Sequence, residues 1–346
     1  MHNGKRITVT TTRLALALSD GCPEGDFLVI GARGGDDLSP LDPAHTRIRQ
    51  GHFPDHNALA ARGFLVAPAV EGRFDGALVI LPRAKAEARA RIADAASRLV
   101  PGAALWIDGQ KTDGIDSMLR ELRLLAPVDE VHSKAHGKIF RVTVPAGDWL
   151  PDDWTARARE VVPGFVTRPG VFSADGIDPG SAMLAAALPD RMPTRVVDLG
   201  AGWGWLSAQA LARPGIEAIH LVEADHAALE SARENISDLR AQFHWADARD
   251  FTLREPVNGV IMNPPFHDGR MADPRIGADF IAAAARLLTG AGRLWMVANR
   301  HLPYETALAQ HFAQVTELRG DNRFKVIEAT GAGRNASRNP VRKARR

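Results

Sequence analysis

The sequence predicts an α/β protein built from two tandem Rossmann-like domains, of which the second holds a ligand site. Short apolar runs alternate with stretches of helical periodicity along the 346 residues, which is typical of open, mostly parallel sheets. A glycine-rich turn at residues 200–204 follows one such run, and the order of elements in the first half recurs in the second. The length fits two domains at ~150 residues each.

The first half alternates predicted strands and helices. Strands are expected at residues 27–32, 63–67, 76–81 and 103–107, with a helix at 83–99 that Pro101 and Gly102 end. Asp113 is expected to cap a helix that runs to Leu125, and residues 137–144 alternate like an antiparallel edge strand. Pro54 lies between His52 and His56 and favours a loop, so no metal site is expected there.

Composition and charge bound the class of protein. Cys22 is the only cysteine, which fits a reducing compartment, and no apolar run approaches the ~18 residues that span a bilayer. The apolar patch at residues 14–18 is shorter than the apolar region of a signal peptide. We therefore expect a cytoplasmic protein with no membrane and no metal partner, and a monomer.

Net charge is +2, but residues 334–346 carry six basic residues and no acid, and the other 333 residues hold 37 basic and 41 acidic ones. A basic tail on a slightly acidic body suits a polyanion such as RNA, and it equally suits a disordered, solubilising tail.

Four prolines between residues 145 and 169, around a predicted helical stretch at 152–162, mark a domain boundary. The predicted domains are residues 1–150 and 151–333, followed by the tail at 334–346. Residues 75–82, 102–107 and 138–142 resemble residues 258–265, 292–297 and 323–327, which indicates a duplicated fold. Ile80 and Leu81 stand in the first copy where Asn263 and Pro264 stand in the second, so the first copy is expected to be catalytically silent.

In the second half, strands are expected at residues 195–200, 217–224, 241–247, 259–263 and 292–298, with helices at 226–239 and 277–288. Ligands bind at the carboxyl ends of such strands. Gly200, Gly202 and Gly204 allow a close backbone approach to a ligand, but Trp205 breaks the G-x-G-x-x-G spacing of dinucleotide sites and disfavours a dinucleotide oxidoreductase.

Three acidic residues lie near the carboxyl ends of the first three of these strands and suit an adenosyl cofactor. Asp198 suits a cationic amino group, Glu223 can accept two ribose hydroxyls, and Asp247 can accept from an adenine amine. The alternative is that all three are surface acids that cap helices.

The segment Asn263-Pro264-Pro265-Phe266 follows the fourth strand of this half. An exocyclic base amine is a poor nucleophile, and the Asn263 oxygen and the Pro264 carbonyl can accept its two hydrogens and direct its lone pair at a methyl group. Phe266 can stack on a base. His267 suits substrate contact or proton acceptance equally, and the alternative for the whole segment is a rigid proline turn.

Four motifs together resemble the bacterial ribosomal RNA guanine-N2 methyltransferases, of the small-subunit methyltransferase C type and the related large-subunit methyltransferase G type. They are NPPFHDG at residues 263–269, PGVFSADGIDPGS at 169–181, VANRHLPY at 297–304 and RFKV at 323–326. The resemblance implies two class I methyltransferase domains, with the second catalytic and the first a degenerate copy for RNA binding or structural support. The tail lies outside the family's pattern.

The resemblance also implies roles for individual residues. The S-adenosylmethionine site would comprise Asp198, Gly200, Ala201, Gly202, Gly204, Glu223, Ala224, Asp247 and Ala248, with Gly180 and Ser181 closing over the cofactor. The catalytic segment would be Asn263, Pro264, Pro265 and Phe266. Candidate contacts to ribosomal RNA or a ribosomal subunit are Arg168, Phe172, His267, Arg300, Arg323 and Lys325, although Phe172 and Phe324 also suit the core. Because the target amine is buried in stacked RNA, the base is expected to flip out.

The sequence leaves two rival functions open. Methyltransferases that act on protein glutamine or on adenine N6 carry Tyr where this chain carries Phe266. A catalytically inactive RNA-binding module is disfavoured by the intact Asp198, Glu223 and Asn263.

Overall fold

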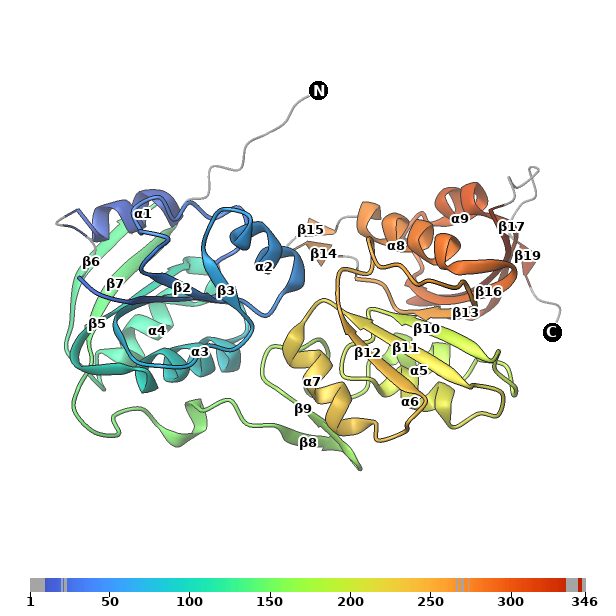
Figure 1. Ribbon diagram of the computed structural model, residues 1–346, viewed down its shortest axis with the longest axis horizontal. Coiled ribbons are helices and arrows are strands. Elements are labelled where there is room, and N and C mark those ends of the chain that lie inside the picture. Colours follow the sequence, from blue (N-terminus) through green and yellow to red (C-terminus); the bar gives the residue numbers. More distant parts are fainter. Residues whose placement is uncertain are drawn as a thin grey trace, which may run out of the picture. The chain divides into compact units, whose positions relative to one another are not determined.

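The computed structural model of the protein describes residues 10–19, 21, 24–265, 267–268, 271–272, 274–333 and 342–343. The chain divides into two compact units, Met1–Ala158 and Arg159–Arg346. Each unit contains one large sheet with helices packed on it (Figure 1). The predicted architecture, two tandem α/β domains with mostly parallel sheets, is confirmed.

The sheet of the first unit has the strand order β3-β2-β1-β4-β5-β7-β6, in which β7 runs antiparallel to its neighbours and the first five strands are parallel. Its elements are α1 (Thr10–Ala17), β1 (Phe27–Ile30), β2 (Thr46–Arg49), α2 (Phe53–Ala60), β3 (Leu65–Ala67), β4 (Phe74–Ile80), α3 (Lys85–Ser97), β5 (Leu99–Gln110), α4 (Ile115–Leu122), β6 (Val128–Lys134) and β7 (Gly137–Thr143).

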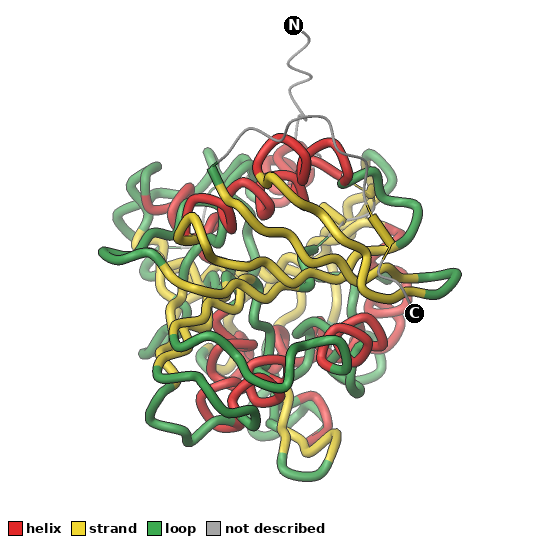
Figure 2. The backbone as a smooth tube through the Cα atoms, turned by 90° about the vertical axis from the view of Figure 1, so that its right-hand side faces the viewer, coloured by secondary structure: helices red, strands yellow, loops and turns green. Residues whose placement is uncertain are grey.

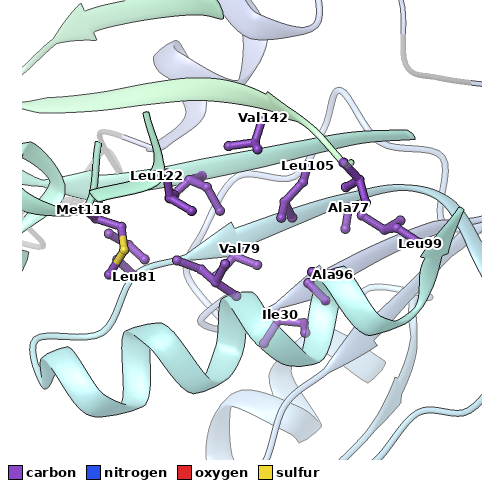
Figure 3. Close-up of a cluster of buried hydrophobic side chains, with 14 of the residues drawn as sticks. Ile30, Ala77, Val79, Leu81, Ala96, Leu99, Leu105, Met118, Leu122 and Val142 are labelled. Atoms are coloured by element: carbon purple, nitrogen blue, oxygen red, sulfur yellow. The ribbon is translucent and has the colours of Figure 1, made fainter. Parts of the chain in front are cut away.

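Both faces of this sheet are buried, which explains the uninterrupted apolar run of β1. Leu28 and Ile30 face a core that α3 and α4 cover, whereas Phe27 and Val29 face a second core that includes Leu14 of α1 and Leu59 of α2. Figure 3 shows the first of these cores, with side chains from β1, β4, α3, β5, α4 and β7 meeting between sheet and helices.

The sheet of the second unit has the order β12-β11-β10-β13-β16-β18-β17-β19. Its elements are β8 (Arg159–Val162), β9 (Phe165–Thr167), α5 (Pro179–Ala185), β10 (Arg195–Leu199), α6 (Trp205–Leu211), β11 (Ala218–Glu223), α7 (His226–Asn235), β12 (Ala241–Trp245), β13 (Val257–Met262), β14 (His267–Asp268), β15 (Met271–Ala272), α8 (Pro274–Leu287), β16 (Leu288–Asn299), α9 (Glu305–His311), β17 (Phe312–Gly320), β18 (Phe324–Ala332) and β19 (Arg342–Lys343). The strands β8 and β9 form a separate hairpin before α5.

Helices cover this sheet on both sides (Figure 2). One core holds Val197 and Leu199 of β10 together with side chains of α8 and α9, and the other holds Val196 together with side chains of α5, α6 and α7. Successive residues of a strand point to opposite faces, so Asp198 points to the same side as Val196, towards α6.

The two large sheets have the same strand order over seven strands, which supports the predicted duplication. Gly76 pairs with Phe27 in the first unit, and Gly259 pairs with Val196 in the second. If Gly76 and Gly259 are equivalent, Ile80 takes the position of Asn263, four residues further along the strand. On the neighbouring strands Val29 takes the position of Asp198, because Phe27 and Val196 pair with these glycines. The same count along β2 and β11 places Gln50 in the position of Glu223.

The register corrects part of the sequence comparison. Gly76 pairs with Ala104 and Gly259 pairs with Arg293, so Trp106 of β5 corresponds to Trp295 of β16. The comparison of residues 102–107 with 292–297 was one residue out of step. The two glycines from which the comparison was aligned are not equivalent, because Gly102 lies two residues before Ala104 and Gly292 lies one residue before Arg293.

Several predicted elements differ from the structure. The segment with Pro54 was predicted as a loop but forms α2, because proline in a first helical turn removes no hydrogen bond that the helix makes. Asp113 was predicted as a helix cap, but it lies in a 3₁₀ turn at Lys111–Asp113, and Gly114 precedes α4 without a side-chain cap. The predicted edge strand at 137–144 is β7, which lies between β5 and β6.

The linker also differs from its prediction. The stretch predicted as helical at 152–162 contains a 3₁₀ turn at Asp152–Trp154 and then strand β8. Trp154 is buried in the core of the first unit, and Arg89 of α3 lies 5.2 Å from its ring, so this part of the linker packs on the first unit.

Candidate active site

The turn between β10 and α6 contains three glycines in the left-handed conformation, with φ of +76° at Gly200, +56° at Gly202 and +85° at Gly204. Their surroundings differ. A Cβ at Gly204 would lie 2.9 Å from Ile236, so Gly204 serves the packing of α6 against α7. A Cβ at Gly202 would meet no atom within 4 Å, which leaves this part of the turn open to a ligand.

Asp198 lies at the end of β10 and is 1% exposed. Its Oδ2 accepts a hydrogen bond of 2.7 Å from the Ser207 hydroxyl of α6, and its buried Oδ1 has no hydrogen-bond partner among the residues that the structure describes. Burial raises the pKa of the Asp198 carboxyl to about 7. A buried carboxylate oxygen without a partner costs free energy unless a ligand donor meets it, so this atom fits the amino group of a cofactor such as S-adenosylmethionine.

Glu223 ends β11 and joins that strand to the glycine turn. Its Oε2 accepts from the Gly202 N–H at 2.7 Å, and its Oε1 accepts from the Asp225 N–H at 2.8 Å. Burial raises the pKa of Glu223, and the two backbone donors oppose that effect. Each oxygen keeps a second lone pair, so the carboxylate can also accept from vicinal hydroxyls. The neighbouring Ala224 carbonyl accepts from Trp245 Nε1 at 2.9 Å.

Asp247 follows β12, and its carboxylate already binds Arg249, with Nε–Oδ1 at 2.9 Å and Nη2–Oδ2 at 2.5 Å. A ligand amine would therefore share this carboxylate with Arg249. The next residue, Ala248, is 4% exposed and packs in the core with Phe280, so its side chain faces away from solvent.

Asn263 follows β13, and α5 fixes its side chain. Its Nδ2 donates to Asp178 Oδ2 at 2.8 Å and to Ser181 Oγ at 2.9 Å. Asp178 is the N-cap of α5 and also accepts from the Ser181 N–H at 2.7 Å. Sequence reasoning did not single out Asp178. The signal was present, because an aspartate three residues before Ser181 and followed directly by proline is a typical helix start.

Two cavities meet at Asn263. A cavity of about 40 Å³ lies on the glycine turn, and its lining includes Asp198, Gly200, Gly202, Ser181 and Asn263. A second cavity of about 250 Å³ lies against Asn263, Pro264, Asn299, Tyr304, Arg323 and Phe324. Phe172, Asp178 and Asn263 line both. The carboxyl ends of β10 and β13 and the start of α5 thus converge on one place.

Two phenylalanines that line the larger cavity, Phe172 and Phe324, are accessible to solvent. Phe172 is 59% exposed, so the prediction that it belongs to the core is wrong. Phe324 is half-buried, and the Arg323 guanidinium lies 5.2 Å from its ring. Pro264 is buried and Pro265 is exposed. Phe266 lies outside the described residues, and for His267 only its backbone in β14 is described.

Three basic residues that the sequence analysis offered as RNA contacts already have protein partners. Arg168 donates to Ser231 Oγ at 2.9 Å and pairs with Glu234. Arg300 pairs with Glu317 at 2.9 Å and also donates to the Phe324 carbonyl. Lys325 is 4% exposed and donates to the Leu302 carbonyl and to Glu305. Of the six candidates, Phe172 and Arg323 line the larger cavity.

The described residues also bear on membrane and metal sites. They contain no helix that is both long and apolar enough to cross a membrane. Within the same residues, no group of three or more histidine, cysteine, aspartate or glutamate side chains is placed to hold a metal ion.

Residues 163–328 match the family model described as methyltransferase small domain. The chain is 31% identical over 296 residues to the ribosomal RNA small subunit methyltransferase C of Hahella chejuensis, covering 80% of this chain and 85% of that protein. It is 33% identical over 263 residues to the protein of the same name from Shewanella pealeana, covering 73% and 76%. Similarity to the Cronobacter sakazakii protein of that name extends over 345 residues at 28% identity.

A solved structure with the same architecture is that of the T. thermophilus 16S rRNA N2 G1207 methyltransferase (RsmC) in complex with AdoMet and guanosine. The TM-score is 0.78 at 24% sequence identity, with 95% of this chain and 93% of that chain covered. The likeness therefore extends over both units.

Proposed function

The chain belongs to the ribosomal RNA small subunit methyltransferase C family, and from this membership we propose that it transfers a methyl group from S-adenosylmethionine to the exocyclic N2 amine of a guanine in small-subunit ribosomal RNA. The observation that carries the proposal is the position of Asn263 on the wall shared by two cavities. One cavity lies on the glycine turn, where a cofactor belongs, and the other is open to an acceptor base.

The chain's own residues fit the cofactor. Asp198 Oδ1 would accept from the amino group of the cofactor, Glu223 would accept from the ribose hydroxyls, and the open face at Gly202 leaves room for a ligand close to the backbone. Gly180 and Ser181 of α5, and Asp247 with Ala248 after β12, would complete the cofactor site. When bound, S-adenosylmethionine supplies an electrophilic methyl group: the N–C bond forms as the C–S bond breaks, S-adenosylhomocysteine leaves and one proton is released.

The acceptor amine needs a free lone pair. Asn263 Oδ1 and the Pro264 carbonyl accept its two N–H groups, which draws the nitrogen out of the plane of the base and directs its lone pair at the methyl carbon. Proline at 264 and 265 leaves no backbone N–H to compete for these acceptors. The proton that the amine loses passes to water. The aromatic rings of Phe172 and Phe266 are proposed to stack on the base, which must leave the RNA stack to enter the cavity.

The first unit is proposed to be catalytically silent. Val29, Gln50 and Ile80 occupy the positions of Asp198, Glu223 and Asn263, so this unit lacks both carboxylates and the amide. The Arg91 guanidinium also donates to the Ile80 carbonyl at 3.0 Å and would clash with a Cβ at Gly31, which corresponds to Gly200. We propose that this unit serves RNA binding or structural support.

The remaining assignments follow from the substrate. We propose that the protein acts in the cytoplasm, as a monomer, on a ribosomal subunit or its RNA. Arg323 is the proposed basic contact beside the acceptor cavity, because it lines that cavity. The tail at 334–346 is proposed as a further phosphate contact on the grounds of its charge alone.

A labelling experiment tests the proposed function. The protein is incubated with methyl-labelled S-adenosylmethionine and small ribosomal subunits from a strain that lacks the enzyme, and the RNA is digested to nucleosides. We expect label in N2-methylguanosine. Label in N6-methyladenosine or in protein, or no label, would refute the proposal and favour one of the rival functions.

A further inference from the structure

We propose that Asp178 is a positioning residue for methyl transfer: it fixes which way the Asn263 amide points. The inference rests on the proposed function, in which the Asn263 oxygen accepts from the guanine amine. Asp178 has no assigned role in the family motifs or in the proposed cofactor contacts. The evidence for the inference is the hydrogen bond that joins the start of α5 to the end of β13.

The contact joins residues that are 85 positions apart in the chain. Asp178 Oδ2 accepts from Asn263 Nδ2 at 2.8 Å, and Ser181 Oγ accepts from the same nitrogen at 2.9 Å. Asp178 and Asn263 both line the cofactor-side cavity and the acceptor cavity. The amide therefore lies at the point where the two reactants meet, with its nitrogen held by α5.

The orientation matters because the two ends of an amide have opposite roles. An ionised carboxylate can only accept hydrogen bonds, so Asp178 selects the rotamer in which Asn263 presents Nδ2 to it. The oxygen is then the free end and can accept from an incoming amine. In the reversed orientation Asn263 would present N–H groups to the N–H groups of guanine, and no bond would form. Ser181 alone cannot choose, because a hydroxyl both donates and accepts.

The same carboxylate oxygen has a structural role that any test must separate. It accepts from the Ser181 N–H at 2.7 Å and so caps α5. Serine caps helices about as well as aspartate. Its hydroxyl is one carbon shorter, so Asp178→Ser keeps the cap and removes the bond to Asn263. Asp178→Asn keeps both a cap and an oxygen that can accept from Asn263, and serves as the conservative variant.

The experiment compares the steady-state kinetics of methyl transfer to small ribosomal subunits by the wild type, Asp178→Ser and Asp178→Asn. For Asp178→Ser we expect kcat to fall about 10- to 100-fold while KM for the subunit stays within about threefold. Asp178→Asn should recover much of kcat. In an Asn263→Ala background Asp178→Ser should cause no further loss, because the group on which it acts is gone.

A second measurement reports the contact without turnover. In protein labelled with ¹⁵N-asparagine, the Asn263 side-chain signal is identified by its absence in Asn263→Ala, and its exchange with water should be faster in Asp178→Ser than in the wild type. Asp225 caps α7 in the same way, because it accepts from the Ala227 N–H at 2.9 Å. The variant Asp225→Ser therefore measures how much stability is lost when serine replaces aspartate at a helix cap.

The outcomes are distinguishable. An unchanged kcat in Asp178→Ser, or an equal loss with and without Asn263, overturns the inference even if guanine methylation is found. An inactive wild type refutes the proposed function instead, and the exchange measurement still decides whether Asp178 holds the amide. If Asp178→Ser does not fold, Asp178→Thr tests the same contact, because threonine also caps helices and its hydroxyl is likewise one carbon shorter than the Asp178 carboxylate.

Discussion

The backbone N–H of Gly202 donates to Glu223 Oε2 across 2.7 Å and so connects the turn after β10 to the end of β11. The two residues are 21 positions apart in the chain, and the bond fixes the open part of the glycine turn relative to the Glu223 carboxylate. In the proposed function Glu223 therefore has two roles, as an acceptor for the cofactor and as a support of the glycine turn.

Substitution of Glu223 should weaken cofactor binding. Glu223→Ala removes charge-assisted bonds to the ribose hydroxyls and frees the Gly202 N–H, and hydrogen bonds to charged groups contribute about 1.5–3 kcal/mol each. We expect the Kd for S-adenosylmethionine to rise about 10- to 100-fold in calorimetry. Glu217→Ala, on an exposed residue before β11, is the matched control and should bind like the wild type. Equal affinities in both variants would contradict the assignment.

Cofactor affinity should depend on pH through Asp198. Its pKa is raised to about 7 in the free protein because the carboxyl is buried, and a bound amino group would lower it. Binding therefore favours the deprotonated form, and the Kd should rise about tenfold per pH unit as the pH falls below 7. Above pH 7 the Kd should level off. Asp198→Asn should bind more weakly and lose this dependence; an unchanged profile in that variant would exclude Asp198 as its source.

Asn263→Ala should separate binding from chemistry. The side chain is placed to hold the acceptor amine, so its removal should leave the cofactor Kd unchanged and lower kcat by about 10²- to 10³-fold, as for other lost transition-state contacts. Calorimetry and single-turnover labelling measure the two quantities on one preparation. A large loss of cofactor affinity would place Asn263 in the cofactor site instead.

A buried ion pair should stabilise the first unit. Arg13 of α1 and Asp108 of β5 are each 1% exposed, with Nε–Oδ1 at 2.5 Å and Nη2–Oδ2 at 2.9 Å. Arg13→Ala leaves a buried charge without its partner and should lower the free energy of unfolding by about 3–5 kcal/mol. Lys138→Ala breaks the more exposed pair with Asp116 and should cost less than about 1 kcal/mol. Denaturant unfolding of both variants checks the difference, and equal losses would contradict it.

Removal of residues 334–346 should weaken RNA binding more at low salt than at high salt. The tail carries six basic residues, and contacts to phosphate release counterions. Affinity for small-subunit RNA measured across a salt series gives the slope of log K against log salt. An unchanged slope in the truncated protein would mean that the tail makes no phosphate contact.

The predictable part of the protein consisted of local patterns. Strand β10 with its glycine turn could be recognised because a buried strand, a turn with positive φ and a helix follow one another within a dozen residues. Asp198, Glu223 and Asn263 could be selected because the carboxyl ends of parallel strands meet at one edge of a sheet. The repeated order of elements likewise predicted two similar sheets. It also predicted that Ile80 stands in the first sheet at the position of Asn263 in the second.

The predictions that failed depended on neighbours that the periodicity of a segment does not show. Residues 137–144 look like an edge strand because they alternate, and only the pairing of β6 outside them shows otherwise. Phe172 looks like a core residue, yet its side chain is 59% exposed. Lys325 looks free for RNA until Glu305 and the Leu302 carbonyl are found beside it.

The sequence by itself determined the fold class, the glycine turn and the residue types at the strand ends, because these follow from backbone conformation and periodicity over a few neighbouring residues. Only the tertiary structure decided that Asp178 accepts a hydrogen bond from Asn263 and that Arg249 pairs with Asp247. It also decided that one Asp198 oxygen has no partner among the described residues. Hydrogen bonding and desolvation depend on which groups the folded chain brings within about 3 Å, and sequence separation does not encode that distance.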